Sequence, residues 1–112
     1  MTKKGNYLGE LEELVLLSIA SQSDQAYGVS IKKDIMKETD RNVNISAIHE
    51  VLKRLERKGY LQSKMGGATK ERGGRRKRYF ILTAAGRNTL EETMNIKLRL
   101  YKRIPNFTIK PI

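Results

Sequence analysis

A dense cluster of cations occupies residues 70–78, and an apolar segment follows it directly. The cluster reads Lys70-Glu71-Arg72-Gly73-Gly74-Arg75-Arg76-Lys77-Arg78, and the next four residues are Tyr79-Phe80-Ile81-Leu82. Strand-forming residues that come straight after a polar, glycine-containing segment favour the rising arm of a β-hairpin over a disordered tail. The sequence therefore predicts a hairpin whose long loop, residues 66–77, carries a high positive charge. We call this loop the wing.

The composition of the wing suits contact with phosphate groups. Arginine can bind phosphate oxygens through two parallel N–H groups or enter a narrow minor groove, and glycine allows the backbone to approach a polyanion closely. The candidate contact residues of the wing and the strand after it are Lys70, Arg72, Gly73, Gly74, Arg75, Arg76, Lys77 and Arg78. The alternative is a solvated hairpin tip that binds no partner.

Positive charge is concentrated in the middle of the chain. Residues 1–43 carry 6 cations and 7 anions, residues 44–78 carry 11 and 3, and residues 79–112 carry 6 and 2, which gives the net charge of +11. Solubility does not require so uneven a distribution, whereas a surface that binds a polyanion does, so nucleic acid is the leading partner. A membrane surface is the main rival. It is disfavoured because glycines interrupt the cationic segment, which also lacks the apolar face of an interfacial helix.

Composition also argues against several kinds of chemistry. The 112 residues have room for one domain and one appended helix, and the absence of cysteine removes disulfides and thiolate metal sites. His49 is the only histidine, and no nucleophile, base and orienting group or phosphate-binding Gly-Lys-Ser motif is recognisable. We therefore expect no enzyme activity, no metal and no cofactor. The first residues resemble neither a secretory signal nor a membrane span, so a cytoplasmic protein is expected.

Three helical patterns precede the hairpin. The first covers residues 8–20, where the apolar residues at helical spacing are Leu8, Leu11, Leu14, Val15, Leu17 and Ile19, with Leu16 beside them. The second runs from Tyr27 to Thr39 and has one apolar face. The third runs from Ile45 to Lys58, after Asn44 as the capping residue, and Gly59 closes it.

The third helix has the form of a DNA recognition helix. Its apolar stripe consists of Ile45, Ile48, Leu52 and Leu55, and its other side carries short polar side chains first and cations farther along. The candidate DNA contacts on it are Asn44, Ser46, Ala47, His49, Glu50, Lys53 and Arg57, and Tyr27 and Lys32 of the second helix are further candidates. An ordinary solvated helix face is the alternative, and the neighbouring basic wing makes it less favoured.

A last helix is expected after the hairpin strands, which we place at residues 60–65 and 78–82. Thr83 should cap this helix, which runs from Ala84 to Ile104, where Pro105 ends it. Its apolar stripe is formed by Leu90, Met94, Leu98 and Tyr101. At about 30 Å it is long for a domain already closed by three helices and a hairpin, so we expect the stripe to contact a second chain. The expected division is a DNA-binding domain at 1–83, a dimerisation helix at 84–105 and a tail at 106–112.

The order helix, helix, helix, strand, basic loop, strand is that of a winged helix-turn-helix, and residues 8–86 resemble the PadR-like family of transcriptional regulators. The matching segments are Leu8-Gly9-Glu10, Ala26-Tyr27-Gly28, Leu55-Glu56-Arg57-Lys58-Gly59-Tyr60-Leu61, Glu71 to Phe80 and Leu82-Thr83-Ala84-Ala85-Gly86. The last two are the most specific. The resemblance implies a mainly α fold with a small antiparallel β-hairpin, a winged helix-turn-helix plus a C-terminal dimerisation helix.

Two departures from the family pattern bear on function. Many members have Tyr-Pro near the start of the recognition helix, where this chain has His49-Glu50, so we assume no shared operator. Some small members hold aromatic ligands between subunits with a tryptophan of the last helix, and this chain has no tryptophan. Tyr101 could offer a flat surface there, although a tyrosine at helical spacing with Leu98 more commonly serves packing.

Together these features predict a homodimeric, sequence-specific regulator of double-stranded DNA, and the resemblance implies a repressor. Such a regulator can take a small-molecule effector, whose identity the sequence does not reveal. Two other hypotheses remain: a non-specific nucleic-acid-binding accessory protein that uses the same basic surface, and an adaptor that docks on a different protein through its last helix.

Overall fold

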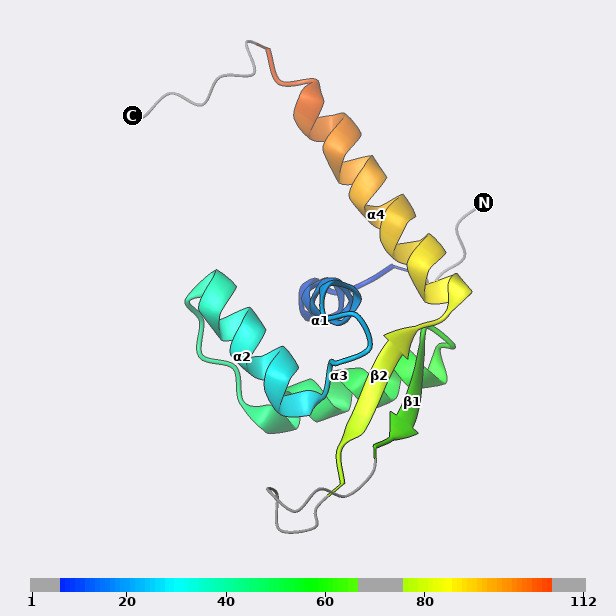
Figure 1. Ribbon diagram of the computed structural model, residues 1–112. Coiled ribbons are helices and arrows are strands. Elements are labelled where there is room, and N and C mark those ends of the chain that lie inside the picture. The colour runs from blue at the N-terminus through cyan, green and yellow to red at the C-terminus, as the bar shows by residue number, and fades with distance from the viewer. Residues whose placement is uncertain (1–6, 67–75, 106–112) are drawn as a thin grey trace.

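The computed structural model describes residues 7–66 and 76–105, which form a mainly helical fold with one antiparallel hairpin (Figure 1). The elements in chain order are α1 (Glu10–Ser21), α2 (Gly28–Thr39), α3 (Ile45–Arg57), β1 (Leu61–Met65), β2 (Arg78–Leu82) and α4 (Ala84–Lys102). This is the predicted winged helix-turn-helix with a C-terminal helix. The described part of the wing is Gly66, Arg76 and Lys77.

Local hydrogen bonds set the ends of the helices. The side-chain oxygen of Asn44 accepts a 2.8 Å bond from the backbone N–H of Ala47, and the hydroxyl of Thr83 accepts one of 3.0 Å from Gly86, so both predicted caps are confirmed. Gly59, after the end of α3, has a φ of +82°, a conformation that glycine adopts without strain. The first helix begins at Glu10 instead of Leu8, because Gly9 is its N-cap residue and donates its N–H to the Glu12 carboxylate at 2.8 Å.

Helix α1 lies at the centre of the molecule, with α2 and α3 on one side and α4 on the other (Figure 1). It contacts α2, α3, α4 and β2. Its fully buried side chains include Val15 and Leu16, which meet Ile31 of α2, Ile48 and Leu55 of α3 in one core. Leu17, which belongs to the predicted apolar pattern of this helix, is 40% exposed. The adjacent Leu16, which the prediction placed beside that pattern, is fully buried in the core.

A short segment before α2 pairs with the hairpin as a third strand would, and the sequence did not predict this pairing. β1 and β2 pair antiparallel in a register that sets Leu61 opposite Leu82 and Met65 opposite Arg78. On the other edge of β2, Tyr27 forms a β-bridge with Tyr79, and the N–H of Phe80 donates to the carbonyl of Ala26 at 2.9 Å. The segment just before α2 therefore ties the base of the hairpin to the helix-turn-helix.

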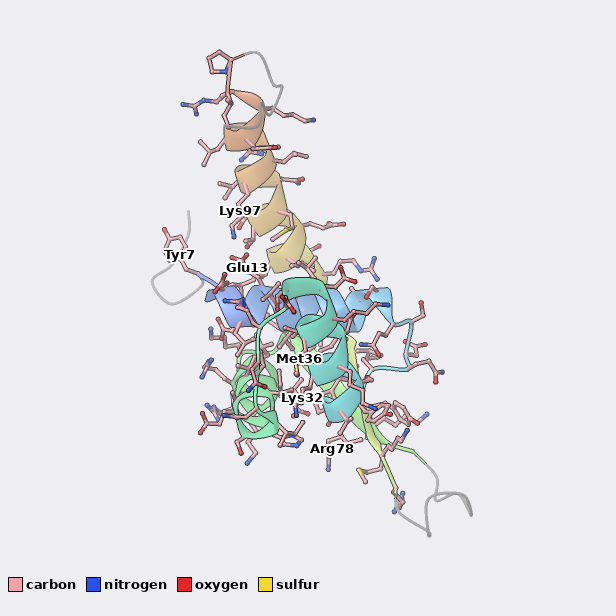
Figure 2. All side chains as sticks on the ribbon, turned by 90° about the vertical axis from the view of Figure 1, so that its left-hand side faces the viewer. Tyr7, Glu13, Lys32, Met36, Arg78 and Lys97 are labelled. Carbon is pink, nitrogen blue, oxygen red and sulfur yellow. The ribbon has the colours of Figure 1, made fainter. Side chains whose placement is uncertain are left out.

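Helix α4 leaves the body of the molecule after its first turns (Figure 1). Leu90 is buried and Met94 packs half-buried against the core, whereas Leu98 and Tyr101 are 47% and 43% exposed. Between Met94 and Leu98, the Lys97 ammonium forms an ion pair with the Glu13 carboxylate of α1, and Figure 2 shows the two residues facing each other between the helices. Half of the predicted stripe is thus packed within this chain, and its distal half lies open.

None of the helices in the described part of the chain is both long enough and apolar enough to span a bilayer.

Candidate nucleic-acid interface

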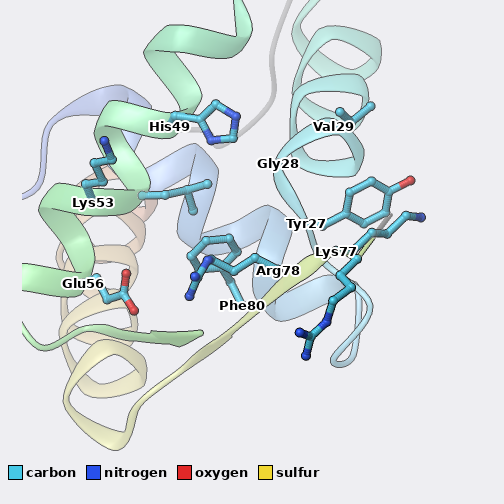
Figure 3. A pocket seen from close by; sticks show the side chains of 11 residues that line it. Tyr27, Gly28, Val29, His49, Lys53, Glu56, Lys77, Arg78 and Phe80 are labelled. Carbon is cyan, nitrogen blue, oxygen red and sulfur yellow. The ribbon is translucent and has the colours of Figure 1, made fainter. Parts of the chain in front are cut away.

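An open cleft of about 1000 Å³ separates α3 from the start of α2 and the arms of the hairpin (Figure 3). The side chains and backbone that line it come from Tyr27, Gly28, Val29, His49, Leu52, Lys53, Glu56, Arg76, Lys77, Arg78 and Phe80. Four of these residues are cations and one is an anion. The structure therefore brings the predicted recognition helix and the described end of the wing to the same cationic surface.

The outer face of α3 is polar over its whole length. The buried residues of the helix are Ile48, Val51, Leu52 and Leu55. The side chains on the opposite side, all exposed, are Ser46, Glu50, Lys53 and Arg57. Those four positions follow one another at intervals of three or four residues, so they share one face. Ala47 is half-buried.

His49 points from α3 toward the first turn of α2 (Figure 3). Its ring lies so close to Gly28 that a β-carbon there would stand 2.9 Å from Cε1 of His49. The two helices of the helix-turn-helix approach each other closely at this point because residue 28 has no side chain. His49 is exposed and belongs to the cleft between the helices, beside the outer face of α3.

Asn44 stands in front of α3 and holds its first turn. Its Oδ1 is the acceptor for the N–H of Ala47, so its amide oxygen serves the helix cap. Of the two candidates at α2, Tyr27, its N-cap residue, lines the cleft, whereas Lys32 is half-buried and does not line it.

The described cations beside the cleft are held by specific contacts. Arg78 donates from Nη1 to the hydroxyl of Ser63 at 2.8 Å, and that hydroxyl donates to the Glu56 carboxylate at 2.7 Å. Nε of Arg76 donates to the carbonyl of Gly66 at 3.1 Å across the two arms of the hairpin. These bonds limit the positions that the two guanidinium groups can take. Lys70, Arg72, Gly73, Gly74 and Arg75 lie outside the described residues.

Lys77 lies over the aromatic ring of Tyr27 (Figure 3). Its ammonium nitrogen is 3.7 Å from the ring centroid, a cation–π contact. The Tyr27 ring in turn meets the edge of Tyr79, with centroids 5.9 Å apart and planes at 78°. The aromatic pair lies at the base of the wing and holds one of its cations over the Tyr27 ring. Sequence reasoning named Tyr27 and Lys77 separately and had no signal for their contact, because the two residues are 50 positions apart in the sequence.

A buried ionic cluster behind α3 was also missed. The Glu12 side chain of α1 is 5% exposed and accepts from Nε of Arg54 at 2.9 Å and from Nζ of Lys58 at 3.0 Å. Burial acts to raise the pKa of Glu12, but the Gly9 N–H and the two cations outweigh it and hold that pKa below its ordinary value of 4.5. Two cations at the C-terminal end of α3 thus neutralise a buried acid of α1, and neither of them lines the cleft.

Across residues 7–66 and 76–105, His, Asp and Glu form no group of three or more that could hold a metal ion. The chemistry of the described surface is that of hydrogen-bond donors, hydrogen-bond acceptors and fixed cations.

Comparison with known proteins finds the same fold in several transcriptional regulators. No curated protein matches the sequence significantly. Among solved structures, a PadR-like transcriptional regulator from Bacillus cereus superposes with a TM-score of 0.71 at 19% identity, over 90% of this chain and 93% of that chain. A PadR family transcription regulator from Clostridium difficile gives 0.67 at 24% identity, over 88% and 96%. A transcriptional regulator from Clostridium thermocellum gives 0.65 at 24% identity, over 89% and 93%. These likenesses establish the shared fold.

The match to a family model carries the assignment further. The model of the transcriptional regulator PadR-like family matches residues 16–92, which span the helix-turn-helix, the wing and the start of α4. The cleft, helix α3 and the arms of the hairpin all lie inside the matched range. The chain therefore belongs to the PadR-like family of transcriptional regulators.

Proposed function

We propose that two copies of this chain bind a near-palindromic DNA site and repress transcription from it. The observation that carries the proposal is the exposed outer face of α3, with Ser46, Glu50, Lys53 and Arg57, beside a cleft whose other wall carries the cations Arg76 to Arg78. A helix with polar side chains along one exposed face fits the major groove, and flanking cations fit the phosphates on either side.

Within this proposal, different residues contact the bases and the sugar-phosphate backbone. Ser46, Ala47, His49 and Glu50 approach the base edges, while Lys53 and Arg57 lie farther along α3, toward the backbone. The wing cations, together with Lys77 over the Tyr27 ring, contact the backbone or the minor groove next to it. Residues 1–83 form the DNA-binding unit.

The partner of α4 is proposed to be a second copy of the chain. Leu98 and Tyr101 are exposed on the distal part of α4, and Ile96, Leu100 and Ile104 are also 44%, 53% and 53% exposed there. Several large exposed apolar side chains on one projecting helix are typical of a surface that binds another protein chain. A twofold axis through the paired α4 helices, residues 84–105, would set two α3 helices about 34 Å apart, on successive major grooves.

Regulation by a small molecule fits the same geometry. A ligand that bound preferentially to a dimer whose α3 helices are spaced differently would lower the affinity for the site, since only differential binding shifts such an equilibrium.

The proposal is tested by selecting bound fragments from random duplex DNA and then measuring affinity at fixed salt. We expect a near-palindromic consensus with half-sites about 10 base pairs apart, bound about a thousandfold more tightly than random sequence. A protein that bound every duplex equally would instead be a non-specific accessory protein. A chain that stayed monomeric until it met a different protein would be an adaptor, and either result contradicts the proposal.

A further inference from the structure

Glu50 is an anion at the centre of the surface proposed to enter the major groove. It lies on the outer face of α3, between Ser46 and Lys53, and its side chain is exposed. No cation in the described residues lies within ion-pair distance of its carboxylate, as the ion pairs found there involve Glu10, Glu12 and Glu13. A cationic surface thus contains one acid whose charge no described side chain compensates.

Two cations lie about one helical turn beyond Glu50, namely Lys53 and Arg54, and neither forms an ion pair with it among the described residues. Arg54, one helical turn farther along, donates to Glu12 behind the helix. The other exposed acid of α3, Glu56, differs from Glu50 because it accepts a bond from Ser63 and so helps to hold Arg78. Glu56 therefore has a structural role in the hairpin base, and Glu50 has none within the described chain.

An unpaired carboxylate in a groove lined by phosphates is repelled, so its presence there requires a compensating hydrogen-bond donor from the DNA. In the major groove the only base donors are the amino groups of cytosine and adenine. A carboxylate accepts and cannot donate. At adenine the carboxylate meets the N7 acceptor next to the amino group, and at thymine and guanine it meets no donor at all. Cytosine is therefore the base that a carboxylate fits best.

We infer that Glu50 reads a cytosine in each half of the DNA site, by accepting a hydrogen bond from the N4 amino group. This inference rests on the proposed function and adds to it the base that one residue selects. The repulsion that Glu50 suffers from phosphates is the same at every sequence, while the hydrogen bond forms only at a C·G pair. Glu50 therefore lowers affinity for random DNA and restores it at the correct site, which increases discrimination.

The experiment is a selection from random duplex DNA with the wild-type dimer and the variants Glu50→Gln and Glu50→Ala. The matched control is Glu38→Gln, which changes another exposed acid, on the last turn of α2. Wild type and control should share one C·G position in each half-site, and replacing that pair should weaken binding about tenfold or more. Glutamine pairs with both the amino group and N7 of adenine, so Glu50→Gln should change that position to A·T.

Glu50→Ala should lose the preference at this one position, keep the rest of the consensus and bind random DNA more tightly. Because residue 50 is exposed, the thermal midpoints of all variants should match wild type. An unchanged consensus in both Glu50 variants would overturn the inference while leaving the proposed function intact. A wild-type protein that selects no consensus would overturn the proposed function, and the inference with it.

Discussion

The carboxylate of Glu12 on α1 accepts a hydrogen bond of 2.9 Å from Nε of Arg54 on α3, and Nζ of Lys58 donates to the same oxygen at 3.0 Å. Glu12 also accepts from the N–H of Gly9, in front of α1. One buried side chain therefore joins the start of α1 to the end of α3. The orientation of α3 therefore depends on a charge that lies outside the surface proposed to face DNA.

The Glu12 contact predicts a stability that depends on pH. The folded protein lowers the pKa of Glu12, so its contribution is fully present above the ordinary value of 4.5 and is lost as the pH falls through the lower folded-state value. Glu12→Gln should reduce the free energy of unfolding by about 1–2 kcal/mol at pH 7. Urea unfolding at pH 7, 5, 4 and 3 should show the difference between variant and wild type shrinking below pH 4.5. Glu91→Gln, an exposed acid on α4, is the control. A constant difference across this pH range would contradict the assignment.

The approach of α4 to the hairpin predicts a strict requirement for glycine at position 86. A β-carbon at Gly86 would stand 2.1 Å from the carbonyl oxygen of Tyr60. Because this neighbour is backbone, Gly86→Ala must displace α4 or β1, and we expect it to cost about 2 kcal/mol or more in chemical unfolding. Gly9→Ala is the matched control, since its β-carbon would meet only the Glu12 Oε1 atom at 3.8 Å. Equal stability of the two variants would show that the contact tolerates a methyl group.

The described cations beside the cleft predict the salt dependence of DNA binding. Replacing Arg76 and Lys77 by alanine should weaken binding to every sequence alike and flatten the plot of log affinity against log salt by about 0.9 per lost phosphate contact. The control replaces Lys33 and Lys37, exposed cations of α2 that do not line the cleft. Fluorescence anisotropy with one duplex at several salt concentrations measures the slope. If the double variant kept the wild-type slope, these cations would lie outside the DNA interface.

The exposed end of α4 predicts the effect of a charge on assembly. Leu98→Glu puts an anion on a side chain that is 47% exposed in the single chain and is proposed to be covered in the dimer. We expect a folded monomer in sedimentation velocity and operator binding weakened about a hundredfold, because the two half-sites are then bound independently. Arg99→Glu, about a third of a turn away from Leu98 and opposite the stripe, should remain dimeric. A dimer that survives Leu98→Glu would place the interface on another surface.

Local features could be predicted from the sequence because their causes lie within a few residues. The caps at Asn44 and Thr83 bond to N–H groups three residues later, and the return strand 78–82 follows from its own apolar run. The polar outer face of α3 likewise follows from helical spacing. Each of these depends on the chain's periodicity and on short-range hydrogen bonds, so the helix order, the hairpin and the candidate DNA-facing residues could be derived without coordinates.

Contacts between distant residues required the tertiary structure. The pairing of Ala26 and Tyr27 with β2, the ammonium of Lys77 over the Tyr27 ring and the burial of Glu12 against Arg54 all join segments more than 40 residues apart. The division of the α4 stripe into a packed half and an open half is of the same kind, because helical spacing shows which residues share a face and only packing shows which of them are covered. The sequence by itself determined the elements and their polar and apolar faces. The tertiary structure alone decided which charges are neutralised inside the protein and which remain for a partner, since that depends on side chains brought together by folding.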